Sequence, residues 1–239
     1  MFYEFKNQTD TGRELFVYGD IVGKKGYADR AEVDLMDFRD SLDEMLSGQH
    51  LSVYINSGGG SVFAASTMVS MLKRARESGI VVDAYIDGLA ASAASFLALS
   101  ADNVFAYRNS MMMVHKPMSI AFGNVNDMRH EIESLDSVEK NVMLPIYMAR
   151  SKIGREDMQK LIDAETWLGA DEIADVFSIS VIDEEKVAAA CSSKFFDRYR
   201  NTPTSVLAPG NRVKPPKRTN ITDYSEYENR IFAAKGDRS

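Results

Sequence analysis

The chain contains very little cysteine and histidine. Its 239 residues include one cysteine, Cys191, and three histidines, His50, His115 and His130. A single cysteine excludes an intramolecular disulfide framework and is typical of a protein from a reducing compartment. Cysteine and histidine are also too few and too scattered to supply a zinc-type ligand set, so the sequence predicts neither a metal site nor another cofactor.

Long apolar runs and a basic-then-apolar leader are also missing. The chain starts with MFYEFKNQTDTGRELF, which mixes charged, polar and aromatic residues and does not resemble a signal peptide. No stretch approaches the roughly 20 apolar residues that are needed to cross a bilayer. The longest low-charge run, residues 88–101, is shorter and rich in Ser and Ala. We therefore expect a cytoplasmic protein without a membrane partner.

Positive charge is in the minority. Lys and Arg number 28 against 35 Asp and Glu, which gives a formal net charge of -7 and a pI near 5.1. This balance argues against nucleic acid as the main partner. The 45% hydrophobic and 26% charged residues are ordinary for a globular protein with a sizeable core.

Proline is scarce except near the end of the chain, where the composition changes. Four of the six prolines follow residue 202, in a region with few regularly spaced apolar side chains. Such a composition is typical of a linker or tail. We therefore predict one domain over residues 1–190 and a Pro-rich, flexible tail over residues 191–239.

Strand-like and helix-like segments alternate in the predicted domain. The predicted strands are rich in β-branched, aromatic and alternating apolar residues, and they cover residues 14–22, 51–56, 80–87, 103–108 and 111–116. The predicted helices have apolar residues at three- and four-residue steps or are uniformly apolar, and they cover residues 30–46, 61–79, 88–101, 126–152 and about 154–165. This alternation favours an α/β fold with largely parallel strands.

The longest predicted helix, residues 126–152, has an apolar stripe along one side. Pro145 lies inside this helix and is expected to kink or interrupt it. The stripe fits packing against the sheet as well as contact with another subunit, and we favour the subunit contact.

Three consecutive glycines, Gly58–Gly60, stand between a predicted strand and a predicted helix. One glycine would serve a turn, so three indicate that a group approaches the main chain closely or that amides face a negative charge. A phosphate-binding loop needs Lys followed by Ser or Thr, and a dinucleotide fingerprint needs spaced glycines. Because this loop fits neither pattern, the transient oxyanion of an acyl-transfer reaction is the better candidate.

Ser92 is the candidate nucleophile for such a reaction. Alanines surround it in the small-residue segment, so a carbonyl group can approach its hydroxyl. Serine needs a base, and His115 suits that role because it follows an apolar strand that would deliver it to the rim of the sheet. The acid that orients the histidine could be Asp163, Glu165, Asp171 or Glu172. Spacing alone does not choose among these four.

Taken together, these segments resemble the proteolytic subunit of the Clp protease family. The matching pieces are the glycine-loop segment YINSGGGSVFAA, the nucleophile segment DGLAASAASFLALSAD, the histidine segment NSMMMVHKP and the acid segment ETWLGADEIAD. They occur in the family's order, from about residue 15 to residue 185. The amino-acid sequences of these segments are most similar to those of Clp-like proteases of tailed phages and prophages, which are often assigned to head maturation.

The resemblance implies a catalytic triad. Ser92 corresponds to the nucleophile and His115 to the general base. The family's aspartate falls on Glu165, whose longer side chain must fold back to reach His115. Asp163 remains an alternative for this third position.

The resemblance also implies which residues bind the substrate. Gly60 and Ala93 match the positions whose amides form the oxyanion hole, and Gly59 lies beside them. Gly58 replaces the family's usual proline, which loosens the turn without removing a donor. An extended peptide is expected to lie as an added strand beside the segments that follow Gly60 and His115. Backbone contacts with it are expected at Ser61, Val62, Met118, Ser119 and Ile120.

From the resemblance we expect an α/β, Clp protease/crotonase-like spiral of repeated ββα units with a long protruding handle helix at residues 126–152. In the family, the handles of two heptameric rings interdigitate and enclose a chamber. The implied partners are a protein or peptide substrate, further copies of the chain, and either an AAA+ unfoldase or phage capsid proteins. A phage-encoded member would work in the cytoplasm of its bacterial host.

Three other interpretations compete with a Ser-His-acid endopeptidase. An enoyl-CoA hydratase-like protein shares the spiral but generally lacks the Ser–His pair. A signal peptide peptidase uses a Ser–Lys dyad, and Lys116 is a poor base for one because neighbouring strand residues point to opposite faces. The strongest competitor is a capsid-assembly or scaffold protein that keeps the protease fold with little activity.

Overall fold

The computed structural model describes residues 3–9, 12–24, 32–43, 45–184, 191, 193–204 and 206. All of them belong to one unit, Met1–Pro209. Within these ranges no helix is both long and apolar enough to span a membrane.

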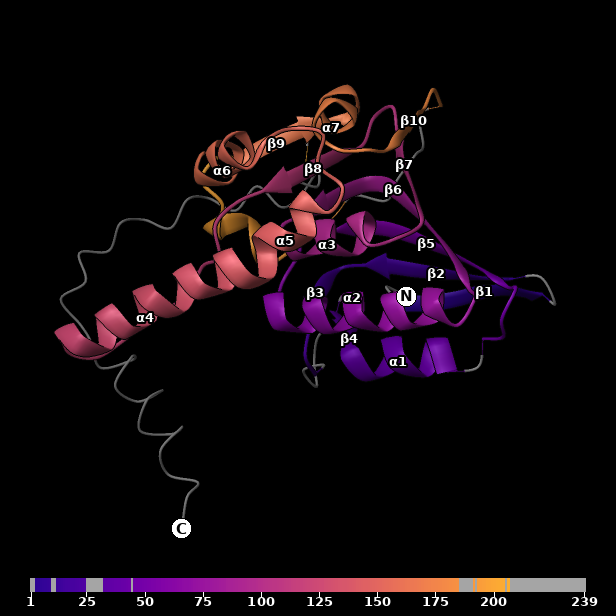
Figure 1. Ribbon diagram of the computed structural model, residues 1–239, viewed down its shortest axis with the longest axis horizontal. Coiled ribbons are helices and arrows are strands. Elements are labelled where there is room, and N and C mark those ends of the chain that lie inside the picture. The colour runs from indigo at the N-terminus through magenta and orange to yellow at the C-terminus, as the bar shows by residue number, and fades with distance from the viewer. Residues whose placement is uncertain are drawn as a thin grey trace, which may run out of the picture. The chain divides into compact units, whose positions relative to one another are not determined.

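A mostly parallel sheet organises the fold (Figure 1). Its main path runs in the order β1 (Tyr3–Thr9), β2 (Gly12–Tyr18), β5 (His50–Ser57), β6 (Val81–Ala91), β7 (Asn103–Tyr107) and β10 (Ser180–Ile182). β1 is antiparallel to β2, and every later pair on this path is parallel. The α/β class predicted from the sequence is confirmed.

Two strands branch from this path, and two more form a small separate sheet. β8 (Met111–Val114) pairs in parallel with the last residues of β6, and β9 (Thr166–Gly169) pairs antiparallel with β8. β3 (Asp20–Val22) pairs with β4 (Glu32–Asp34). The branch is important for function because it places the end of β8 beside the end of β6.

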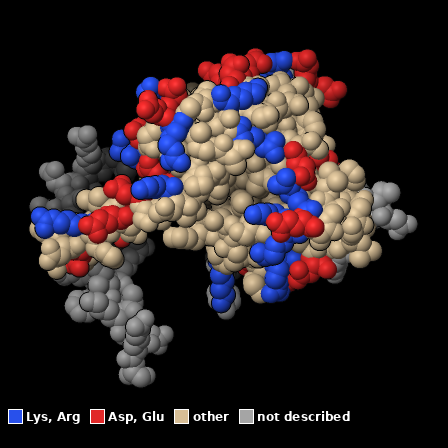
Figure 2. Space-filling view, viewed as in Figure 1, with Lys and Arg blue, Asp and Glu red and all other residues tan. Residues whose placement is uncertain are grey.

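Helices pack on both sides of the sheet (Figure 1). α1 (Leu35–Asp43) and α2 (Val62–Glu77) lie below it in this view, and α6 (Arg155–Asp163) and α7 (Ala170–Val176) lie above it. Strand and helix residues share one buried cluster, which includes Leu15, Val53, Ile55, Met68, Leu72, Phe96 and Leu97. Figure 2 shows carboxylates gathered over α6 and α7, while Lys and Arg are mixed with acidic groups over the rest of this face.

The helix α4 (Val125–Val138) projects from the body (Figure 1), and none of its residues is buried. Its first turn is closed by a capping box between Asn124 and Asp127. A π-helical turn, Glu139–Met143, follows α4, and the next helix, α5 (Leu144–Met148), has Pro145 in its first turn. Proline lacks an N–H and clashes with the carbonyl four residues earlier. The predicted interruption of the long helix is therefore confirmed.

Two predicted helix starts are wrong. Residues 88–91 continue strand β6, and the helix α3 (Ala93–Leu99) begins only after Ser92. Pairing of residues 89–91 with β8 explains this, because a tertiary ladder overrides the helix propensity of alanine. Similarly, residues 32–34 form β4, and α1 begins after Asp34, whose carboxylate accepts hydrogen bonds from the first amides of the helix.

The predicted strand over residues 14–22 is also wrong in detail. Gly19, with φ 117°, ends β2, and the chain turns into β3 of the second sheet. This turn brings Ile21 against the glycine loop, with which it forms a parallel bridge at Gly60. The break thus supports the loop that the sequence singled out.

Candidate active site

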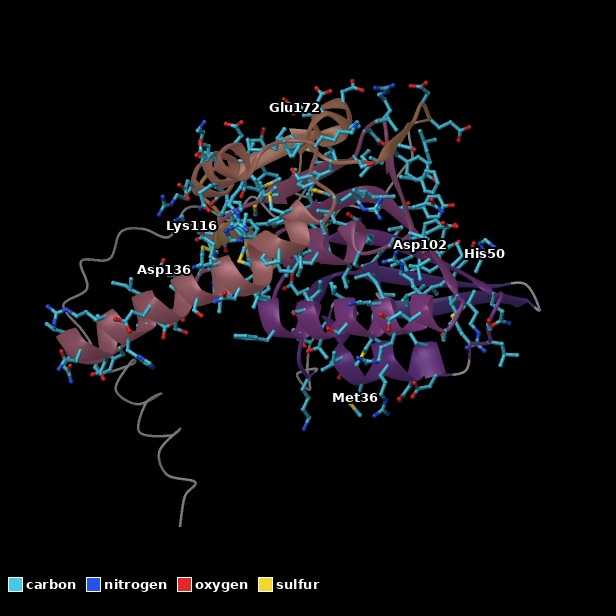
Figure 3. All side chains as sticks on the ribbon, viewed as in Figure 1. Met36, His50, Asp102, Lys116, Asp136 and Glu172 are labelled. Carbon is cyan, nitrogen blue, oxygen red and sulfur yellow. The ribbon has the colours of Figure 1, made fainter. Side chains whose placement is uncertain are left out.

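The predicted site residues gather at one end of the sheet. In Figure 3, His50 and Asp102, which lie at the starts of β5 and β7, mark the opposite end from Lys116. Ser92 follows β6 and His115 follows β8, so both lie at the carboxyl ends of parallel strands, as Lys116 does. Ligands of open α/β sheets bind outside these ends.

Ser92 occupies a sharp turn between β6 and α3. Its backbone has φ 52° and ψ -124°. A residue with a side chain pays about 1–3 kcal/mol for such a conformation. Ser92 N–H donates to Met113 O at 2.8 Å, and Ser95 Oγ donates to Ser92 O at 2.6 Å. The turn is therefore held by neighbouring elements, which fix the hydroxyl at the end of the strand.

His115 lies against Ser92 because their strands are neighbours. Ala91 pairs with Met113 in parallel register, so the residues that follow the two strands reach the same edge. His115 Nε2 and Ser92 Oγ are 2.7 Å apart and share a hydrogen bond. A hydroxyl and an imidazole at this distance form the nucleophile–base arrangement of acyl transfer.

Burial controls the protonation of His115. It lowers the pKa of the imidazole to about 4, and the negative charge of Glu165 opposes that shift. At neutral pH the ring is therefore uncharged, and its Nε2 can accept the proton of Ser92. The electrostatics of the site suit the role of a general base.

The glycine loop, Gly58–Gly60, packs closely between Ser92 and β3. A side chain at Gly59 would lie 2.8 Å from Ser92 Cβ, and one at Gly60 would lie 2.1 Å from Ile21 O. Gly59 and Gly60 also have φ values of 95° and 147°. Residues with side chains rarely adopt these conformations. Space and backbone conformation therefore both require glycine at the two positions.

Hydrogen bonds within the loop determine where its amides point. Gly59 N–H donates to Ser57 Oγ at 3.1 Å, and Gly59 O accepts from Ile21 N–H at 2.8 Å. In a trans peptide the N–H points opposite to the preceding carbonyl, so the N–H of Gly60 points away from Ile21. Ala93 N–H belongs to the first turn of α3, where amides have no partner inside the helix.

Glu165 is buried in the turn between α6 and β9. It is 8% exposed and has a positive φ of 51°. Its Oε1 accepts a hydrogen bond from Asn201 N–H at 2.7 Å. The carboxylate is near enough to raise the pKa of His115, yet the described hydrogen bonds include none between the two side chains. Glu165 therefore lies close to the Ser92–His115 pair without completing a triad.

The other three candidate acids have partners elsewhere. Asp163 is half exposed, and its Oδ1 lies 3.1 Å from Lys116 Nζ. Asp171 forms an ion pair with Arg108, and Glu172 closes the capping box of α7. Geometry therefore favours Glu165 among the four. Over the described ranges, no three His, Cys, Asp or Glu side chains are grouped so as to hold a metal ion.

The predicted substrate-binding positions fall into two groups. Ser61 N–H already donates to Ile21 O at 2.9 Å, its hydroxyl caps α2, and Val62 is the first residue of that helix. Residues 118–120 are exposed in the irregular segment after β8. A peptide can therefore approach the main chain at 118–120, whereas the amide of Ser61 is occupied.

Sequence reasoning did not select two residues that also lie at the site. The Tyr199 hydroxyl donates to Gly58 O at 2.5 Å, and the Tyr199 ring packs edge-to-face on His115. Asn201 supplies the amide that binds Glu165. Both residues belong to the segment assigned to the tail. The only sequence signal for their docking is the group of aromatic residues that includes Phe196, because large aromatic side chains are usually buried.

Comparison with known proteins gives a consistent result. The family model described as Clp protease matches residues 7–183. The ATP-dependent Clp protease proteolytic subunit 1 of Chlamydia abortus is 33% identical over 133 residues, which cover 54% of this chain and 67% of the relative. The ATP-dependent Clp protease proteolytic subunit of Porphyromonas gingivalis is 29% identical over 146 residues, which cover 60% of this chain and 64% of the relative. The chain thus spans about two thirds of the length of these relatives.

Proposed function

Because this chain belongs to the Clp protease family, whose members are serine endopeptidases, we propose that Ser92, His115 and Glu165 are its catalytic triad. Ser92 is the nucleophile, and His115 is the general base. Glu165 orients the imidazole and stabilises its charged form. The substrate is a peptide or an unfolded protein segment.

One observation carries this proposal, the distance of 2.7 Å between His115 Nε2 and Ser92 Oγ. The two residues are 23 positions apart in the chain, and adjacent parallel strands bring them together. An isolated serine is a weak nucleophile, and a neighbouring uncharged imidazole is the usual way to activate it. The strained backbone of Ser92 adds support, because strain of this kind clusters at active sites.

The proposed reaction is acyl transfer. Ser92 Oγ attacks the carbonyl carbon while its proton passes to His115 Nε2, which gives a tetrahedral intermediate. As the C–N bond breaks, His115 returns the proton to the leaving amine, and an acyl-enzyme remains. Water then attacks the ester with His115 as base, and the Ser92 hydroxyl is restored.

The amides of Gly60 and Ala93 would bind the oxyanion of that intermediate. The N–H of Gly60 points away from Ile21 and β3, and the N–H of Ala93 directly follows the nucleophile. Backbone donors of this kind lower the barrier because they are oriented before the reaction starts. Gly59 contributes space, since a side chain there would meet Ser92.

The substrate would lie extended against the exposed residues 118–120, close to the glycine loop. Main-chain hydrogen bonds to an extended peptide give affinity, and pockets for alternate side chains give specificity. Substitutions at Met118 or Ile120 should therefore raise KM more than they lower kcat.

We further propose that copies of the chain assemble through α4. Large apolar side chains are exposed on α4 and just before it, namely Phe122, Val125 and Ile132. Exposed apolar groups of this kind mark contact surfaces. Contact between projecting helices would enclose the active sites in a chamber. Heptameric rings, an ATPase partner and a role in phage head maturation stay predictions from the family resemblance.

Prolonged incubation with a fluorophosphonate, followed by peptide mapping, tests the triad. This probe reacts with activated serines, so we expect one adduct, on Ser92. The Ser92→Ala variant should lose the adduct. Ser70→Ala, which changes an exposed serine of α2, should keep it. If the folded protein gave no adduct on Ser92 even after long incubation, the scaffold interpretation would replace the proposal.

A further inference from the structure

A segment of the chain's own C-terminal region lies over the catalytic pair. Residues 193–202 are termed the strap. Within the strap, the centroid of the Tyr199 ring lies 5.1 Å from the centroid of the His115 imidazole, and the two ring planes are at 74° to each other. Ser92 and His115 are each only 6% exposed. The strap therefore contributes directly to the burial of the catalytic pair.

The strap also engages the third member of the triad. Asn201 N–H donates to Glu165 Oε1 at 2.7 Å, and Asn201 Nδ2 donates to Ala164 O at 3.1 Å. A carboxylate that orients a catalytic histidine accepts a hydrogen bond from the imidazole N–H. With Asn201 in place, Glu165 accepts its described hydrogen bond from the strap instead.

The beginning of the strap is held by two buried acids. Ser193 Oγ and Lys194 N–H both donate to the carboxylate of Asp20. Lys194 Nζ lies 2.6 Å from Glu32 Oε1. Asp20 and Glu32 are 4% and 5% exposed. Charge-assisted bonds to buried carboxylates fix the register of the strap on the body.

Aromatic side chains anchor the middle of the strap. Phe196 and Tyr199 form a second apolar cluster, which also includes Leu89, Met113, Trp167 and Cys191. The strap is therefore anchored by apolar packing at its middle as well as by polar bonds at its beginning.

We infer that the strap is an intramolecular ligand of the active site, which covers the Ser92–His115 pair and binds Glu165 through Asn201 until it is displaced. This inference rests on the proposed function, since it takes Ser92 and His115 as the reactive pair. The family match ends at residue 183, so the strap lies outside the region that the chain shares with the family model. Its displacement breaks only non-covalent contacts and needs no co-reactant.

The substitution Lys194→Glu in the full chain should open the site. It places a carboxylate against Glu32, and like charges at this distance repel strongly. Lys73→Glu, which makes the same charge change on the exposed face of α2, is the matched control. Neither lysine belongs to the proposed catalytic machinery.

Two rates measured on the same sample report the opening. One is the rate of fluorophosphonate addition to Ser92. The other is the rate of alkylation of Cys191, which packs against the strap, is 7% exposed and has a pKa raised by burial to about 12. We expect both rates to rise about tenfold or more in Lys194→Glu, because repulsion between the new carboxylate and Glu32 displaces the beginning of the strap. Lys73→Glu should leave both rates unchanged.

A second variant keeps the test decisive. A side chain at Gly58 would lie 2.4 Å from Ser193 Cβ, so Gly58→Ala should expel the strap by steric overlap. If Cys191 and Ser92 reacted at the rates of the unmodified protein in both variants, the inference would be overturned. Faster alkylation of Cys191 with an unchanged rate at Ser92 would also overturn it, because the strap would then not limit access. If Ser92 gave no adduct in any variant although alkylation of Cys191 became faster, the proposed function itself would fail.

Discussion

The Ser92–His115 pair and the strap that covers it meet at one place but are stabilised in different ways. The pair sits at the ends of β6 and β8, two hydrogen-bonded strands of the central sheet. The strap is held by a few polar bonds and by an aromatic cluster outside the main core. Regions with few buried contacts open at a lower free energy than core strands. Reactive geometry is thus built into the fold, while access and the position of Glu165 depend on a segment that can leave.

The largest effect should come from breaking the pair itself. In the Lys194→Glu background, His115→Asn should reduce peptide hydrolysis by about 10⁴–10⁶-fold, as loss of a triad nucleophile or base does elsewhere. His50→Asn, which changes an exposed histidine at the opposite end of the sheet, should have little effect. If His115→Asn retained most of the activity, the base would lie elsewhere.

The next effect concerns the acid that the strap engages. In the same open background, Glu165→Gln should lower kcat by up to about 10⁴-fold, because an amide cannot stabilise the imidazolium. Asp163→Asn should change kcat little, since that carboxylate pairs with Lys116. Steady-state hydrolysis of a fluorogenic peptide measures both variants. The reverse order of effects would assign the triad acid to Asp163.

A smaller effect is expected from the oxyanion hole. Gly60→Ala should cost about 10²–10³-fold in kcat, the usual loss for one oxyanion-hole donor. The new side chain would meet Ile21 O and displace the Gly60 amide. Gly154→Ala is the control, because a side chain there meets open space. Equal activities of the two variants would exclude Gly60 from the oxyanion hole.

The pH dependence of Ser92 labelling compares the closed and open sites. In the closed protein the pKa of His115 is lowered to about 4, so the base form persists as the pH falls to 5. Displacing the strap hydrates the ring and returns its pKa toward the ordinary value of about 6.5, which protonates the base at pH 5. At pH 5 the labelling rate of Lys194→Glu should therefore lie about 30-fold or more below its plateau, whereas the rate of the unmodified protein should fall only slightly. If the labelling rates of the two proteins fell in the same way at acidic pH, the link between the strap and the burial of His115 would be contradicted.

The smallest effect should come from one hydrogen bond of the strap. Tyr199→Phe keeps the ring on His115 and removes the bond to Gly58 O. Such a bond contributes about 0.5–1.5 kcal/mol, so alkylation of Cys191 should accelerate about 2- to 10-fold. Tyr85→Phe, in the aromatic ladder on the sheet, is the control. No acceleration would mean that the hydroxyl does not hold the strap.

The sequence predicted the parts of the molecule that local patterns encode. The glycine loop, Ser92 and His115 each stand at the end of an apolar run, so their place at the rim of the sheet could be expected. The boundary between β6 and α3 could not be expected, because an alanine-rich segment suits a strand or a helix until its pairing with β8 is known. At such positions, pairing with a neighbouring strand determines the secondary structure more than composition does.

The strap could not be predicted for a related reason. Its polar and charged residues are typical of a tail, and the contacts that bind it join distant parts of the chain. Asn201 reaches Glu165 across 36 positions, and Ser193 reaches Asp20 across 173. Contacts of this range leave no periodic signal in a single sequence. The few aromatic residues, Tyr199 among them, were the only local sign of docking.

A crystal structure of the Lys194→Glu protein after fluorophosphonate labelling would show both the reactive residue and the position of the strap. We predict a bond from Ser92 Oγ to phosphorus and a phosphoryl oxygen within hydrogen-bond distance of the Gly60 and Ala93 amides. The strap should be displaced, and Glu165 should accept a hydrogen bond from His115. A label on another residue would contradict the role of Ser92 as the nucleophile, and a strap still docked over a labelled Ser92 would contradict its role as a ligand of the site.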